Sequence, residues 1–529
     1  MPGHAKKQHS ENEEAANTPE HDSSRKATNK IRNYLLNDRH KSGDLMSLQT
    51  AKKTTNEIKV LARNILPCLV LRLGEPLVIL ALTFSALLVT AARATTLLDP
   101  EPLPSTTLFG RALAGIGDVN GDRVTDLAVG APYQDGEFDN IDAGFGPPQN
   151  VGKVWILSGA NLSVITVLND PQFQQVQDLK FGGQFGTSLA AAGDVNGDGI
   201  QDVLVGTPNH GPGSEGPFNT GRAFVMNGKS DKVLLTLDDP TPQENARVGT
   251  SVASLGDVNA DGKPDFLVGV PGKDVGDEFS TVGVAYIYSG ADGSVIRTLN
   301  DPAADEGARF GFAVAKAGDV DGDGVSDALI GAPGHSEAFV FSGRTGSLIF
   351  TIPSPAAEKL PSFGYAVAGG KDVNNDGKPD FVIGAPLLKN SQGGVFIFNG
   401  SDGTLSRRLR IPTSQKSARA GASVAAIDDV TGDGRPDIMV GVPDQDVGGR
   451  INAGETLIFS GANGALFQTL TSATPQAFAG FGSALAGVDF DGDGIPTPVV
   501  GVPFQNADLI DPEDGDLVTH LQIGQIEIQ

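Results

Sequence analysis

The chain has 529 residues, enough for a large hydrophobic core, and its 69 glycines and 33 prolines favour many short strands joined by turns. Its formal net charge of −25 disfavours nucleic acid as a partner, because a polyanion would repel it. The only cysteine, Cys68, lies near the N-terminus, so residues 95–529 contain no internal disulfide.

The first 94 residues differ from the rest. Residues 1–60 are polar and lack apolar periodicity, so we expect disorder there, and translation from Met46 would remove most of them. Residues 61–94 combine basic residues with the uncharged stretch Pro76–Ala92, which is typical of a signal peptide cleaved after Ala92-Arg93-Ala94. The alternative is an uncleaved membrane anchor, because this stretch nearly reaches the ~20 residues that span a bilayer. Either leader predicts a secreted or cell-surface protein.

A nine-residue acidic loop then recurs seven times, and each copy is followed by a β-branched run that ends in Gly-(Ala/Val/Thr)-Pro. Six copies read Asp-x-(Asn/Asp/Thr)-x-Asp-x-x-x-Asp. Side chains at positions 1, 3, 5 and 9 and the carbonyl at position 7 form a set of hard oxygen ligands that suits Ca²⁺. A single copy would equally fit a chain of Asx turns, but seven copies in register favour the metal.

The predicted ligands follow these positions in every copy. They are Asp118, Asn120, Asp122, Val124 and Asp126; Asp194, Asn196, Asp198, Ile200 and Asp202; Asp257, Asn259, Asp261, Lys263 and Asp265; Asp319, Asp321, Asp323, Val325 and Asp327; Asp372, Asn374, Asp376, Lys378 and Asp380; Asp429, Thr431, Asp433, Arg435 and Asp437; and Asp489, Asp491, Asp493 and Ile495.

Three of the seven sites are expected to bind more weakly. Arg123 replaces the turn glycine of the first loop, Thr431 replaces a stronger ligand in the sixth, and Thr497 replaces the closing aspartate of the seventh. The loops are not EF-hands, because position 12, where an EF-hand needs a glutamate, is a strand residue such as Val205. The sequence therefore predicts up to seven calcium ions in β-hairpins.

Each repeated unit contains four predicted strands. In different units these are Phe185–Ala190 before the loop, Val203–Gly206 after it, then a third strand such as Val395–Gly400 and a fourth such as Val295–Leu299. The first strand has small residues, as expected near a crowded axis, and the outer ones are larger. Loop starts lie 53 to 76 residues apart, which fits the blades of a propeller.

The last unit lacks a fourth strand, because only Gly524–Ile528 follows its first two strands. The segment Thr95–Pro100 matches fourth strands such as Thr166–Pro171 and is predicted to complete this blade. The predicted fold is therefore an all-β, seven-bladed β-propeller of four-stranded antiparallel blades over residues 95–529, with calcium loops and a ring closed by an N-terminal strand.

The order Phe-Gly, acidic loop, Gly-Ala-Pro resembles the FG-GAP repeat of the integrin alpha-chain N-terminal propeller. All seven units match, with Val248-Gly249 and Ala420-Gly421 replacing Phe-Gly in the third and sixth. The resemblance implies an extracellular, calcium-stabilised propeller that binds a protein or glycan in adhesion and is not an enzyme. It implies contact with a membrane only through an uncleaved leader.

The loops that join second and third strands lie opposite the calcium loops in such a blade, and they are the candidate ligand contacts. We single out Tyr133–Asp139 and Lys273–Phe279, with Tyr133, Phe138 and Phe279 as adhesive side chains; solvated turns are the alternative.

Two other functions remain open. One is a polysaccharide-acting enzyme on a calcium propeller, and the other is a purely structural surface protein. Residues 95–529 contain three histidines, His210, His335 and His520, but no recognisable catalytic motif, and His335 is expected in a solvated loop. With Trp155 as the only tryptophan, aromatic platforms for sugars are not evident.

Overall fold

The computed structural model describes residues 95–100, 107–135, 150–171, 182–211, 218–276, 280–355, 362–412, 415–510, 517–522 and 524–529. The chain divides into two units, Met1–Leu77 and Val78–Gln529, and all described residues belong to the second. The predicted leader regions, 1–60 and 61–94, lie outside the described residues.

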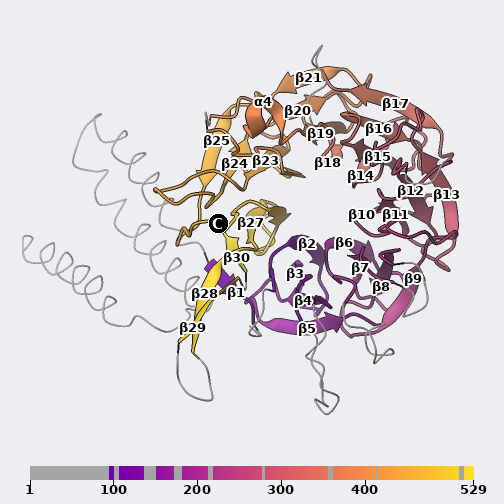
Figure 1. Cartoon of the computed structure of the whole chain (residues 1–529). Helices are drawn as coiled ribbons and strands as arrows, with labels where there is room; N and C mark the ends of the chain where they lie inside the picture. The colour runs from indigo at the N-terminus through magenta and orange to yellow at the C-terminus, as the bar shows by residue number, and fades with distance from the viewer. Residues whose placement is uncertain are drawn as a thin grey trace, which may run out of the picture. The chain divides into compact units, whose positions relative to one another are not determined.

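Seven four-stranded antiparallel sheets form the described region, which confirms the predicted propeller (Figure 1). The strands nearest the axis contact one another in the order β2, β6, β10, β14, β18, β22 and β26, and β26 returns to β2. From the inner to the outer strand the sheets are β2 Ala112–Gly117, β3 Asp126–Ala131, β4 Lys153–Leu157 and β5 Val164–Asn169; β6 Ser188–Gly193, β7 Asp202–Thr207, β8 Arg222–Met226 and β9 Val233–Leu237; β10 Val252–Gly256, β11 Asp265–Val270, β12 Val284–Tyr288 and β13 Val295–Asn300; β14 Ala313–Gly318, β15 Asp327–Ala332, β16 Glu337–Phe341 and β17 Leu348–Pro353; β18 Ala366–Lys371, β19 Asp380–Gly384, β20 Val395–Phe398 and β21 Leu405–Arg408; β22 Ser423–Ile427, β23 Asp437–Val442, β24 Glu455–Phe459 and β25 Leu466–Leu470; and β26 Ala484–Val488, β27 Thr497–Val502, β30 Gln525–Ile528 and β1 Thr95–Leu98. A short helical segment, α4 Leu388–Ser391, lies between β19 and β20.

Burial changes systematically across a blade. The inner strands consist mainly of small residues and are half-buried, as in β6, whereas every residue of the second strand β7 is buried. The third strands are almost fully buried, and the outermost strands are half exposed, as in β9. This gradient follows from the geometry, because strands near the axis crowd together while the rim meets water.

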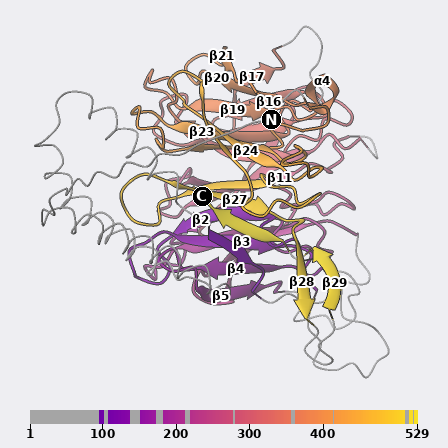
Figure 2. The same cartoon turned by 90° about the vertical axis from the view of Figure 1, so that its left-hand side faces the viewer.

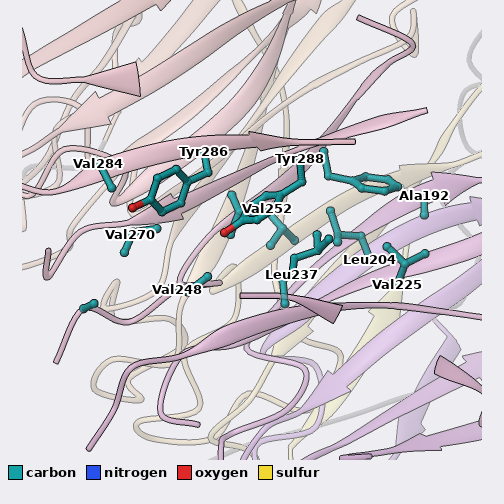
Figure 3. Close-up of a cluster of buried hydrophobic side chains, with 14 of the residues drawn as sticks. Ala192, Leu204, Val225, Leu237, Val248, Val252, Val270, Val284, Tyr286 and Tyr288 are labelled. Carbon is teal, nitrogen blue, oxygen red and sulfur yellow. The ribbon is translucent and has the colours of Figure 1, made fainter. Parts of the chain in front are cut away.

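The hydrophobic cores lie between neighbouring blades. Each of seven buried clusters combines second and third strands of two adjacent blades. Figure 3 shows the cluster between the second and third blades, to which Leu204 and Val225 of the second blade and Tyr286 and Tyr288 of the third belong. The ring closes in the same way, because Trp155 of the first blade packs with Val499 of the last. Burial of this continuous apolar surface is the main stabilising force of the ring.

Each repeat has two glycines at positions where the backbones of neighbouring blades approach each other closely. A Cβ on Gly130, in the Gly-Ala-Pro of the first blade, would lie 2.1 Å from the carbonyl oxygen of Gly186, in the Phe-Gly of the second. The same contact recurs around the ring and closes it, since a Cβ on Gly501 would lie 2.1 Å from the oxygen of Gly110. The repeated glycines are therefore required by the approach of two backbones.

The last blade draws its strands from both ends of the described region. As predicted, β1 pairs with β30 antiparallel, with Thr95 opposite Ile528 and Leu98 opposite Gln525. The sequence did not indicate the extra hairpin of β28 Asn506–Ile510 and β29 Leu517–Gln522, which is inserted between β27 and β30 (Figure 2).

Candidate functional site

The acidic loops connect the first and second strands of each blade. In the second loop, Asp194 accepts hydrogen bonds from the backbone N–H groups of Gly197 (2.7 Å), Asp198 (3.1 Å) and Gly199 (2.8 Å). Asn196 Oδ1 accepts one from the N–H of Asp198 at 2.8 Å, and Asp198 Oδ1 accepts one from that of Ile200 at 2.9 Å. These bonds fold the loop tightly and bring its side-chain oxygens together, as the predicted coordination requires.

The closing aspartate at position 9 is the first residue of the second strand in six blades. Asp202 is fully buried, and its two oxygens accept bonds from the N–H groups of Val195 (2.9 Å) and Gly228 (3.4 Å). The same pair of N–H donors, one in the loop and one after the third strand, meets Asp126, Asp265, Asp327, Asp380 and Asp437.

Burial raises the pKa of each closing aspartate, because a carboxylate loses its hydration inside the protein. The pKa rises to about 6 for Asp202, Asp327 and Asp380. It also rises for Asp126, Asp265 and Asp437. A buried carboxylate of this kind is stabilised by a proton or by a cation, so the donor set fits a divalent ion.

Carboxylates converge most closely in three of the loops. Each residue of these sets offers an oxygen within 4.8 Å of the others: Asp319, Asp321 and Asp327; Asp429, Asp433 and Asp437; and Asp489, Asp491 and Asp493. The last two sets belong to loops expected to bind weakly, and the structure does not test that ranking. The predicted ligands of all seven loops lie in the hairpins formed by the first and second strands of the blades. Their coordination of calcium stays a prediction.

The turn after the third strand also contributes to the loops, a role that was not predicted from the sequence. Ser158 donates a hydrogen bond to Asp122 at 3.3 Å, Asn227 to Asp198 at 3.0 Å and Ser460 to Asp433 at 2.6 Å. The available signal was the Ser/Asn-Gly pair that follows the third strand in six units. This turn covers position 5 of the loop and fixes its carboxylate.

The seventh loop is built differently. Thr497 begins β27 where the other blades have the closing aspartate, and it is half-buried rather than fully buried. A hollow of about 250 Å³ lies here, lined by Asp493, Thr497 and the exposed Phe467, among others. The seventh site thus lacks both the buried carboxylate and its N–H clamp.

The opposite face of the propeller carries the connections from second to third strands and from fourth strands to the next blade. These connections bond to each other, as Arg247 N–H does to the oxygen of Asn219 at 3.1 Å. Within the candidate contact segment Lys273–Phe279, Lys273 is buried and its ammonium lies 2.6 Å from Asp239 Oδ2. The prediction of a contact role is therefore wrong for Lys273, which joins two blades. Tyr133 is half-buried, and Phe138 and Phe279 lie outside the described residues.

The expectation of a solvated His335 is also wrong. Only 8% of this residue is exposed, because it lies between two carboxylates of the connection that leads into the inner strand of its own blade. Its Nδ1 is 3.5 Å from Asp301 Oδ2 and its Nε2 is 3.3 Å from Asp305 Oδ2. His210 occupies the matching position two blades earlier, and burial lowers its pKa to about 3. Short sequence context did not reveal that the connection from the preceding blade covers the loop of His335.

Among the described residues, no helix combines the length and the apolar character that crossing a bilayer requires.

Comparison with known proteins agrees with this architecture. A family model described as the FG-GAP repeat matches residues 109–157, 185–226, 248–288, 363–398 and 420–459. Integrin alpha pat-2 of Caenorhabditis elegans is 29% identical over 222 residues, which cover 37% of this chain and 17% of that protein. Integrin alpha-PS2 of Drosophila melanogaster is 30% identical over 242 residues, 43% of this chain and 15% of that protein. Integrin alpha-V of Gallus gallus is 32% identical over 214 residues, 37% of this chain and 19% of that protein.

The chain thus matches less than a fifth of the length of these relatives. A solved structure of BBS1N in complex with ARL6DN has a TM-score of 0.43 and 11% identity over 83% of this chain and 97% of that chain, too slight a likeness to bear on function. The chain therefore contains FG-GAP repeats, built into a seven-bladed propeller, and is similar to integrin alpha chains.

Proposed function

We propose that residues 95–529 form a secreted or cell-surface ligand-binding module that acts in adhesion, and that calcium stabilises it. In this proposal residues 1–60 are a polar leader and residues 61–94 a signal peptide or membrane anchor. The ligand is an extracellular protein or glycan. The protein binds this ligand without transforming it.

The observation that carries the proposal is the division of the propeller into two faces. One face repeats the same acidic loop, with a buried closing carboxylate in six blades. The opposite face differs from blade to blade, as Lys273 and His335 show. Repetition suits a structural ion, whereas variation suits recognition.

Calcium would act on folding, not as a switch. Extracellular modules generally bind Ca²⁺ with a Kd of about 10⁻⁴ to 10⁻³ M, so their sites stay filled outside cells. Without the ion, the carboxylates of a loop face one another and repel, which destabilises the hairpin. The similarity to integrin alpha chains supports the adhesion role.

An enzyme on this fold would need paired acids outside the loops. Within the described ranges, the convergent groups of three carboxylates all belong to the acidic loops. In this proposal these groups bind calcium and take no part in catalysis.

The test combines calorimetric melting, with millimolar calcium or with chelator, and a count of bound calcium. We expect strong stabilisation and roughly five to seven ions per chain. The purified protein is then applied, with and without calcium, to immobilised matrix proteins and glycans, and calcium-dependent capture is expected. No thermal shift and no bound ion would contradict the calcium role. Ordered arrays in calcium without any captured ligand would favour the structural surface protein.

A further inference from the structure

Two arginines occupy the same position in consecutive repeats on the face opposite the acidic loops. Arg247 precedes Val248-Gly249 of the third blade, and Arg309 precedes Phe310-Gly311 of the fourth. Both are exposed and have positive φ angles, 62° and 55°. Their backbone N–H groups donate to Asn219 (3.1 Å) and Thr281 (3.2 Å), so the neighbouring connections hold both backbones in this conformation.

The two positive charges are not neutralised by the described part of the chain. Neither guanidinium forms an ion pair with a described carboxylate, although the protein as a whole is strongly acidic. Partial burial lowers the pKa of Arg309; Tyr365 opposes this shift, and the charge of Arg247 adds a smaller lowering effect. Like charges repel, so an anion that contacts both guanidinium groups would offset this repulsion.

An aromatic surface continues from the arginine pair. The guanidinium carbon of Arg309 lies 4.5 Å from the ring centroid of Phe312, and the rings of Phe312 and Tyr365 are 4.9 Å apart. Phe312 and Tyr365 directly precede the inner strands β14 and β18, which are neighbours in the ring (Figure 1). Both rings are half-buried, so they are fixed in place and still reach solvent.

We propose that Arg247, Arg309, Phe312 and Tyr365, here called the Arg–aromatic platform, bind an acidic polysaccharide. The guanidinium groups contact its sulfate or carboxylate groups, and the aromatic rings pack against its sugar rings. This inference rests on the proposed ligand-binding function and specifies its ligand class and surface. A polysaccharide fits better than an acidic peptide, because the platform offers planar ring faces and neither a free sheet edge nor a deep apolar pocket for side chains.

The test measures binding of the full protein to dextran sulfate, in calcium, by surface plasmon resonance. Uncharged dextran has the same sugar backbone without the charge, and polyglutamate supplies a polyanion without sugar.

The first variant is Arg247→Gln with Arg309→Gln. The control is Arg450→Gln, which removes one charge from an exposed connection of the sixth blade on the same face. A third variant, Phe312→Leu, keeps an apolar side chain but removes the aromatic ring. Melting temperatures show that each variant folds.

We expect the arginine double variant to weaken dextran sulfate binding by about tenfold or more, and Phe312→Leu to weaken it by about threefold. Arg450→Gln should leave the affinity for dextran sulfate unchanged. Uncharged dextran should not bind. Equal loss in the Arg450→Gln control, tighter binding of polyglutamate than of dextran sulfate, or no binding of dextran sulfate would overturn the inference. If the protein captures a matrix protein and the arginine variants do not alter that capture, the proposed function would stand without this inference. If no ligand is captured at all, both the proposed function and this inference would be wrong.

Discussion

The two faces of this propeller differ in how similar their side-chain contacts are from blade to blade. On the acidic face the same contacts recur, and Asp202, Asp265 and Asp327 are each clamped by two backbone N–H groups. On the opposite face matching positions carry different chemistry: His210 is buried and neutral, and Lys273 forms an ion pair. The acidic face is therefore redundant, whereas side-chain contacts of the other face, such as that of Lys273 with Asp239, differ from blade to blade.

This difference has a consequence for stability. Loss of one acidic loop leaves six others, so its effect should stay small and local, as in repeat proteins whose units contribute nearly additively. Loss of one inter-blade contact on the opposite face has no substitute.

Removing the closing strand should have the largest effect. Deletion of residues 95–100 takes away the partner of β30 and exposes an open sheet edge, so we expect a loss of roughly 5 kcal/mol of unfolding free energy and a tendency to aggregate. Calorimetry and light scattering measure the two effects. As a matched pair, Leu97→Ser should destabilise because Leu97 packs on the core between the last and first blades, and Leu98→Ser should not, because Leu98 is 43% exposed. An unchanged melting temperature in the deletion would refute closure by β1.

Breaking the buried ion pair of the opposite face should come next. Lys273→Met leaves Asp239 buried without its cation, which we expect to cost about 3–5 kcal/mol. Denaturant unfolding measures this loss. Lys232→Met, which changes an exposed lysine in the preceding blade, is the control and should alter stability by less than about 0.5 kcal/mol. Equal effects of the two substitutions would show that the inter-blade pair contributes nothing.

The buried histidine predicts a pH dependence. The pKa of His210 is about 3 in the folded protein and about 6.5 in an unfolded chain, so between these values the unfolded state binds the extra proton. Stability from this group is present above pH 6.5 and falls as the pH is lowered towards 3, by roughly 2 kcal/mol at pH 5. The matching positions of the first and last blades carry Gln134 and Gln505, so glutamine is a suitable replacement. His210→Gln should reduce the difference in melting temperature between pH 7 and pH 5. An unaltered pH profile in this variant would contradict the assignment.

The smallest effect should come from single calcium loops. Asp198→Ala disrupts the second loop, which has its closing aspartate, and should lower the number of bound calcium ions by one and the melting temperature slightly. Asp493→Ala affects the seventh loop, which lacks that aspartate, and should change both quantities less. Calcium counting and calorimetry compare the two variants. If their losses are equal, the proposed ranking of the sites is wrong.

Repetition made most of the architecture predictable. The recurring acidic loop and the Gly-(Ala/Val/Thr)-Pro runs gave the number of blades, and the match between Thr95–Pro100 and Thr166–Pro171 gave the closing strand. These features are local or copied along the chain, so sequence comparison within one chain detects them. The extra hairpin β28–β29 occurs once and had no such signal.

The sequence alone determined the fold class, the ring closure and the positions of the acidic loops, because each depends on residues a few positions apart in a repeated pattern. Only the tertiary structure decided which connections are buried and what they contact. His335 lies between Asp301 and Asp305, and Arg309 stacks on Phe312 near Tyr365, because successive blades bring together residues that are far apart in the chain. Burial and charge at the interfaces between blades depend on the neighbouring blade. The sequence of a single repeat does not show which residues of that neighbour it contacts.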